Sequence, residues 1–111
     1  MNMYFTREKL YGAVICILRK KKGLTIESMV LDGFPVGKST YSRMECGEVP
    51  VNPPVLALIS ERLSTSPSII LTYCEQVEQR LLGRGLTLGP TTTDSIELEG
   101  KGLHSLISTM L

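Results

Sequence analysis

The sequence of 111 residues contains no tryptophan, and only 5% of it is aromatic, so a core must be built mainly from Leu, Ile, Val and Met. Cysteine is also sparse, with Cys16, Cys46 and Cys74 spread widely along the chain. No two of these thiols have the close spacing of a zinc knuckle, and an odd count does not suit a disulfide framework. We therefore expect reduced thiols, as in a cytosolic protein.

Long apolar runs are missing as well. The longest, 13–18, is far shorter than the ~20 residues that span a bilayer, and the N-terminal residues lack the apolar segment of a signal peptide. We expect a cytoplasmic protein with no membrane partner. The single histidine, His104, has no acid or nucleophile at a useful spacing, and Gly83-Arg84-Gly85 lacks the strand that precedes a phosphate-binding loop. The sequence predicts no enzyme, no catalytic residue, no metal site and no cofactor.

What is present is an ordinary globular composition with an uneven distribution of charge. The hydrophobic fraction is 42% and the charged fraction 21%, which is typical of a soluble domain that needs no metal or disulfide. Residues 1–50 carry eight basic and five acidic side chains, whereas residues 51–111 carry four and six. The basic half suits contact with phosphates, and the acidic half is expected to face elsewhere.

Five segments of the first 83 residues have the apolar periodicity of helices. The first, at 6–22, starts at a threonine cap, ends in three lysines before Gly23, and carries its apolar side chains on one side. Four more are expected at about 25–31, 37–47, 52–63 and 66–83, each preceded by a capping residue or a turn. This pattern predicts an all-α domain at residues 1–82.

The last part of the chain is organised differently. Residues 83–93 have the Gly, Thr and Pro content of a linker, and the extension at 94–111 holds a short alternating segment at 95–99 followed by helical spacing. A lone strand and a short helix need a partner. The extension is rich in apolar side chains, so we interpret it as a dimerisation element; packing back on the fifth helix is the alternative. These side chains are Ile96, Leu98, Leu103, Leu106, Ile107, Met110 and Leu111.

The third expected helix has the build of a helix that enters the major groove of DNA. Its small polar and basic residues lie on one side, while Tyr41 and Met44 point inward. We expect base-edge contacts from four of its side chains, although an ordinary solvated helix face is the competing interpretation. These candidates are Lys38, Ser39, Thr40 and Arg43. Phosphate contacts are expected from Lys22, Thr25, Ser42 and Asn52.

Residues 9–82 resemble the lambda-repressor-like (Xre-type) helix-turn-helix family. The resemblance rests on Leu18-Arg19 with Gly23-Leu24-Thr25, on the segment Thr40-Tyr41-Ser42-Arg43-Met44-Glu45-Cys46-Gly47, and on 49–63 followed by Ser66. It implies a five-helix DNA-binding domain and a structural salt bridge between Arg19 and Glu45 across the first and third helices. The chain departs from the family pattern at Ile26, where a phosphate-clamping Gln is usual, at a longer turn over 31–36, and at Gly37, where Ser or Thr is usual.

These features lead to two functional hypotheses. The first is a transcriptional regulator, a repressor that binds a palindromic operator in double-stranded DNA as a homodimer. The second is a protein-interaction module, such as an antitoxin that binds a toxin partner, for which DNA binding is secondary. Only the first needs Lys38 and Arg43 at the exposed helix face.

Overall fold

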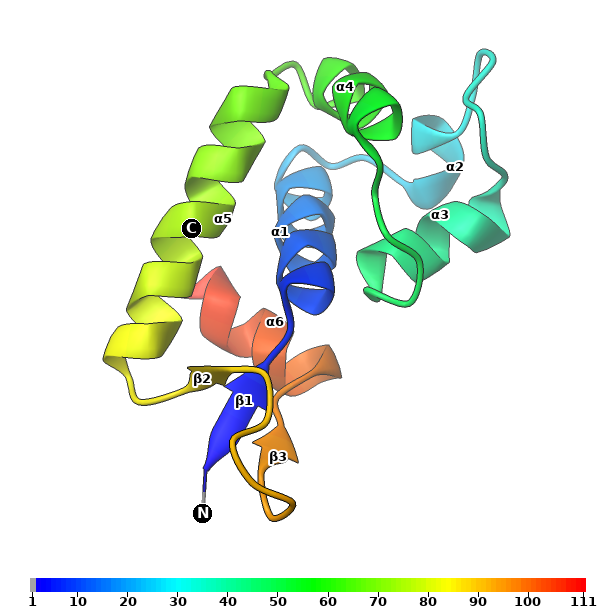
Figure 1. Cartoon of the computed structure of the whole chain (residues 1–111). Helices are drawn as coiled ribbons and strands as arrows, with labels where there is room; N and C mark the ends of the chain where they lie inside the picture. Colours follow the sequence, from blue (N-terminus) through cyan, green and yellow to red (C-terminus); the bar gives the residue numbers. More distant parts are fainter. Residues whose placement is uncertain (1) are drawn as a thin grey trace.

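The structure, a computed structural model, describes residues 2–111, and over them the chain is mainly helical with a small three-stranded sheet (Figure 1). The helices in order are α1 (Arg7–Lys21), α2 (Ile26–Met29), α3 (Lys38–Glu45), α4 (Pro53–Arg62), α5 (Pro67–Gly83) and α6 (Gly100–Ser108). The strands are β1 (Met3–Phe5), β2 (Thr87–Leu88) and β3 (Ile96–Glu97). None of the helices in this described part is long and apolar enough to cross a membrane.

The helix starts follow from local capping chemistry, as the sequence predicts. Thr6, Thr25, Asn52 and Ser66 each accept a hydrogen bond from the backbone N–H three residues ahead, which satisfies a donor that the first turn leaves unpaired. The second helix is shorter than expected, because it ends at Met29 rather than near residue 31.

The early end of α2 has a conformational cause in the following turn. Asp32 and Gly33 both adopt positive φ values, 56° and 79°. Helical geometry requires negative φ, so two consecutive left-handed residues stop the helix and turn the chain toward α3. Gly37 then leads into α3 without a side-chain cap.

The sheet corrects the all-α prediction. Its order is β2-β1-β3, with both neighbours parallel to the central strand, and Tyr4 lies beside Thr87 on one side and Glu97 on the other. The strand expected at 95–99 is confirmed as β3, whereas β1 and β2 are too short to show a clear alternation in the sequence. The predicted linker at 83–93 therefore contains a strand, and the N-terminal residues join it to the extension.

The C-terminal extension packs on its own chain. β3 pairs with β1, and α6 lies against α1, where Leu103 and Ile107 are fully buried. The apolar content of the extension is therefore used mainly within the chain, which removes the reason for interpreting it as a dimerisation element. The alternative placed the extension on the fifth helix, but α1 is its main neighbour; α5 contributes a hydrogen bond from Arg80 to the Met110 carbonyl, 3.2 Å long.

Helix α1 is the centre of the molecule and packs against α3, α5 and α6 (Figure 1). Its residues 12–17 are all buried, so its two long sides are both in contact with other elements. Lys9 on its exposed side connects it to the extension, through ion pairs with Glu99 and, at 2.8 Å, with Glu97. The position of α3 is thus set by a helix that also holds the sheet and the C-terminal residues.

Candidate nucleic-acid interface

The predicted base-contacting residues lie mostly on one exposed face of α3. Lys38, Ser39, Ser42 and Arg43 line a shallow hollow together with Ile26 of α2. Thr40 does not line this hollow and is partly buried. The face is therefore made of short polar side chains flanked by two cations.

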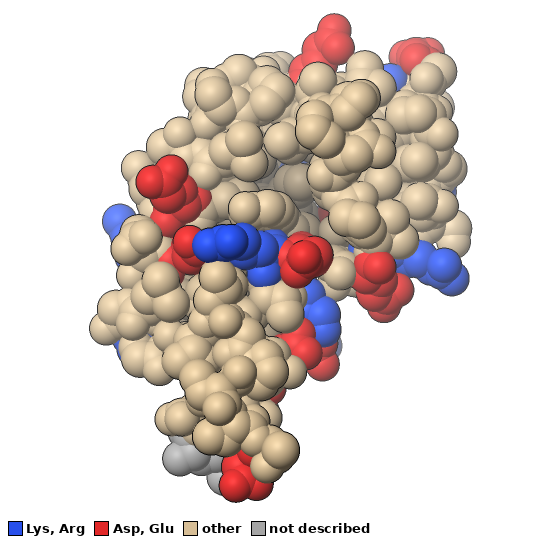
Figure 2. All heavy atoms as spheres, in the orientation of Figure 1, with Lys and Arg blue, Asp and Glu red and all other residues tan. Residues whose placement is uncertain are grey.

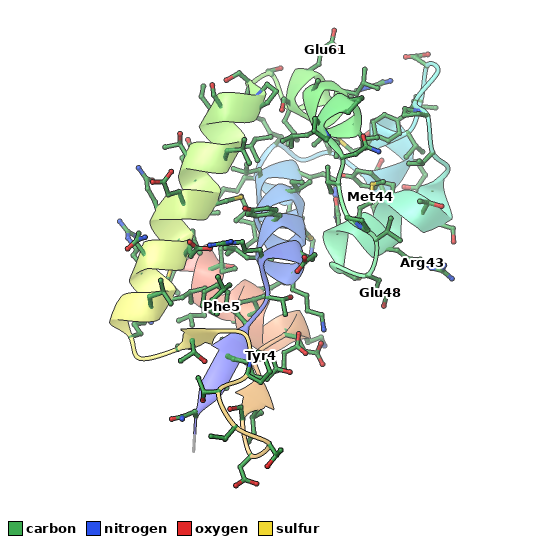
Figure 3. The ribbon with its side chains drawn as sticks, in the orientation of Figure 1. Tyr4, Phe5, Arg43, Met44, Glu48 and Glu61 are labelled. Atoms are coloured by element: carbon green, nitrogen blue, oxygen red, sulfur yellow. The ribbon has the colours of Figure 1, made fainter. Side chains whose placement is uncertain are left out.

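Opposite directions of neighbouring side chains define the two sides of α3. Arg43 points away from the body of the protein, whereas the adjacent Met44 turns toward it (Figure 3). Tyr41 and Met44 are buried and anchor the helix in the core. Burial of the phenol raises the pKa of Tyr41, and the nearby Glu45 carboxylate acts in the same direction, so this side chain is neutral; its hydroxyl has no hydrogen-bond partner among residues 2–111.

Lys38 has a partner on the neighbouring helix α2. Its ammonium forms an ion pair with Glu27 of α2, and both side chains are well exposed. The hydrogen bond from Lys38 lowers the pKa of Glu27, which keeps that carboxylate ionised. Arg43, in contrast, forms no ion pair with any residue of the described part of the chain. It is the cation of this face that is free to meet a ligand.

A buried salt bridge fixes α3 on α1, and it confirms the pairing expected for Arg19 and Glu45. The Arg19 guanidinium donates from Nε to Glu45 Oε2 at 2.7 Å and from a terminal nitrogen to Oε1 at 3.0 Å. A second terminal nitrogen donates to the Leu24 carbonyl at 2.8 Å. Hydrogen bonding to Glu45 raises the pKa of Arg19, so the guanidinium stays charged despite its burial. The Arg19 side chain therefore fixes the positions of both α3 and the segment that leads into α2.

Three of the expected phosphate-contacting residues lie at helix ends, and the fourth, Ser42, lies on α3 itself. Thr25 caps α2 and Asn52 caps α4, where its Oδ1 accepts from the Val55 N–H at 3.0 Å. Lys22 is the exposed C-terminal cap of α1. Because the side chains of the two N-caps are engaged, their remaining backbone N–H groups are the donors that these ends offer to an anion.

One further residue, which no sequence pattern indicates, holds the connection between α2 and α3. Arg62 of α4 donates to the carbonyl oxygens of Leu31 and Asp32, and its guanidinium lies 5.9 Å from the centre of the Phe34 ring. Phe34 in turn meets the edge of Tyr41 with ring centres 5.9 Å apart. A cation–π contact and two hydrogen bonds therefore tie the turn to α4. Nothing in the local sequence around residue 62 indicates this role.

Comparison of the chain with models of protein families, with curated proteins and with solved structures finds no match. Among residues 2–111, no three or more His, Cys, Asp or Glu side chains come together as a metal site would require. The candidate site is accordingly defined by its geometry: an exposed face of small polar and basic side chains on a helix that a buried ion pair holds in place.

Proposed function

We propose that this protein is a sequence-specific DNA-binding transcriptional regulator that inserts α3 into the major groove, as the resemblance to the lambda-repressor-like family implies. The observation that carries the proposal is the combination found in α3. Its outer face presents Arg43 and Ser39 to solvent, with the partly buried Ser42 beside them, while its inner face is fixed by the Arg19–Glu45 pair. Base readout requires side chains that can donate and accept at a helix face held rigidly in register.

In this proposal the side chains of the face divide between two tasks. Arg43 and Lys38 donate to guanine O6 and N7, and Ser39 and Thr40 contact base edges of either kind. Ser42, Lys22 and the helix ends at Thr25 and Asn52 contact phosphates and set the register. Lys38 must leave Glu27 to reach a base, so Glu27 opposes binding to DNA that offers Lys38 no acceptor.

The proposed assembly is a homodimer on a palindromic operator, with repression as the outcome. Two copies related by a two-fold axis would place their α3 helices in successive major grooves about 10 base pairs apart. A protein bound there covers the DNA that polymerase must enter. Doubling the number of phosphate contacts also raises affinity and its dependence on salt.

Replacing Arg43 tests the proposal. The wild-type protein is used to select bound duplexes from a random pool, and binding to a selected and to an unselected duplex is then measured. Arg43→Ala should weaken binding to the selected duplex by about 1–3 kcal/mol and relax the base preference, because a bidentate contact to guanine is lost. Arg84→Ala, which removes an exposed cation beyond α5, is the matched control and should leave specificity unchanged.

Two outcomes would count against the proposal. Failure to recover any preferred sequence would remove sequence-specific recognition altogether. An equal loss on both duplexes would make Arg43 a phosphate contact and would move the readout away from this face.

A further inference from the structure

A second concave site lies on the side of the molecule formed by α1, α4 and α5. It is a chamber of about 260 Å³, and Figure 2 shows the surface hollowed at this place. Its walls come from Tyr11 and Ile15 of α1, Leu56 of α4, and Ile70 and Leu71 of α5. Apart from the Tyr11 hydroxyl and the Cys74 thiol, the side chains that line it are hydrocarbon.

The two polar groups of the chamber carry no charge. Burial raises the pKa of Cys74 to about 12, and burial also raises the pKa of Tyr11. Both therefore stay protonated at neutral pH, and the phenol can donate one hydrogen bond. An apolar enclosure with one well-placed donor is typical of a small-molecule site.

The chamber continues into a smaller polar hollow of about 210 Å³. The two share Tyr11, Leu71 and Cys74, and the smaller one adds Arg7, Glu75 and Glu78. Acidic and basic side chains border the hollowed surface in Figure 2. The polar end thus begins where the apolar walls stop.

The charges of the polar hollow do not cancel. Arg7 is already paired with Glu78, with Nε and Oε1 2.8 Å apart. Glu75 forms no ion pair with any residue between 2 and 111. One carboxylate is left over, and a cation on a ligand would complement it.

We propose that this chamber and its polar hollow bind a small amphipathic amine, with its apolar body between α1, α4 and α5 and its ammonium toward Glu75. A cavity of about 150 Å³ accepts benzene, so the larger chamber has room for a fused ring or a branched chain of roughly ten non-hydrogen atoms. Because the chamber and the polar hollow share lining residues, a protonated amine joined by a short chain to such a body would extend from one into the other.

Three indoles that differ only in the charge of their side chain test this site in the full-length protein. Tryptamine is cationic, tryptophol neutral and indole-3-propionate anionic. Each is titrated while the methyl resonances of Ile15 and Ile70 are followed by NMR. We expect tryptamine to shift both methyls and to bind roughly two- to fivefold more tightly than tryptophol, as an exposed ion pair allows. Indole-3-propionate should bind most weakly.

Two variants locate the binding. Leu71→Trp should fill the chamber and abolish the shifts, whereas Leu82→Trp on the same helix lies outside it and should not; these leucines are 45% and 40% exposed, so both variants should fold, which circular dichroism checks. Glu75→Gln should leave tryptophol binding intact and remove the preference for tryptamine.

Absence of shifts with all three indoles, or binding that survives Leu71→Trp, would overturn the site. Binding of indole-3-propionate at least as tight as that of tryptamine would overturn the assignment to amines. The titration involves no DNA, so its result is independent of the proposed regulator function.

Discussion

At Gly12 the main chain of α1 meets the main chain of α3. A β-carbon at this position would lie 2.6 Å from the Glu45 carbonyl oxygen and closer still to that of Met44. Backbone cannot yield as a side chain can, so the two helices would have to separate. The absence of a side chain at one position therefore sets how near α3 approaches the core.

Gly12→Ala should destabilise the protein by about 1–3 kcal/mol, because the added methyl overpacks the helix crossing. Gly83→Ala is the matched control, since Gly83 also lies in a helix but has open space around it, and alanine should stabilise it by about 0.5–1 kcal/mol. Thermal unfolding of both variants measures the difference. A stable Gly12→Ala protein would mean that α1 and α3 do not touch here.

The Arg19–Glu45 pair gives a second prediction for single residues. The side chains are 9% and 5% exposed, so neither charge can be left in place without its partner. Arg19→Met alone should cost about 3–5 kcal/mol of unfolding free energy by stranding the carboxylate, and adding Glu45→Met should restore most of it. Urea denaturation of the single and double variants measures these unfolding free energies. A double variant no more stable than the single one would show that the stranded charge is not the cause.

The sequence predicts the structural roles of some residues but not of others. The Arg19–Glu45 pair was expected from the family resemblance, because the positions match a recurring motif. No recurring motif predicts the role of Arg62, because its partners are carbonyl oxygens and a ring on a distant turn. Contacts to backbone atoms leave no complementary residue to look for, and they can be found only in three dimensions.

Among the elements, the sequence predicts the helices and the short strand at 95–99, but not β1 or β2. Four capping side chains and a repeated apolar period mark the helix starts, and both signals are local. The strands β2 and β3 have two residues each, and what stabilises them is pairing with β1 at the far end of the sequence. The alternation at 95–99 predicts β3 but not its partner, because the local pattern does not specify which strand pairs with it.

The basic end of α1 carries a prediction about DNA binding. Replacing the three lysines at 20–22 with glutamine should flatten the dependence of log affinity on log salt, lowering the slope by up to about 3, since each phosphate contact contributes about 0.9. A control that replaces Arg80, Arg84 and Lys101 removes the same charge from the other half of the chain. If both variants change the slope equally, the effect is one of net charge and not of contact.

Helix α6 offers a test of whether the extension docks within the chain. Ile107 is fully buried, so Ile107→Ala should cost about 2–5 kcal/mol of stability by leaving a cavity. Ile96→Ala is the control, because that side chain is 45% exposed and should contribute little. Chemical denaturation together with solution mass checks this prediction. If Ile107→Ala changes the mass in solution but not the stability, the extension forms a dimer interface and does not dock within the chain.

At the scale of the whole molecule, the sequence indicated a helical protein with an appended segment but did not show how its ends come together. The apolar residues of the extension were recognised as needing a partner. Choosing between a second copy and the same chain required the arrangement of β1, which lies between two strands from the last quarter of the sequence. Such a choice depends on long-range pairing that no segment encodes alone.

The central position of β1 has a consequence for synthesis on the ribosome. Its partners include Ile96 and Glu97, so this strand must wait until almost the whole chain has emerged before the sheet can close. At about 5–20 residues per second the wait is roughly 5 to 20 seconds, whereas helices form in about a microsecond. During that interval Phe5 and the side of α1 that later meets α6 remain uncovered. The nascent chain thus exposes, next to its first residues, an apolar surface that a chaperone could hold.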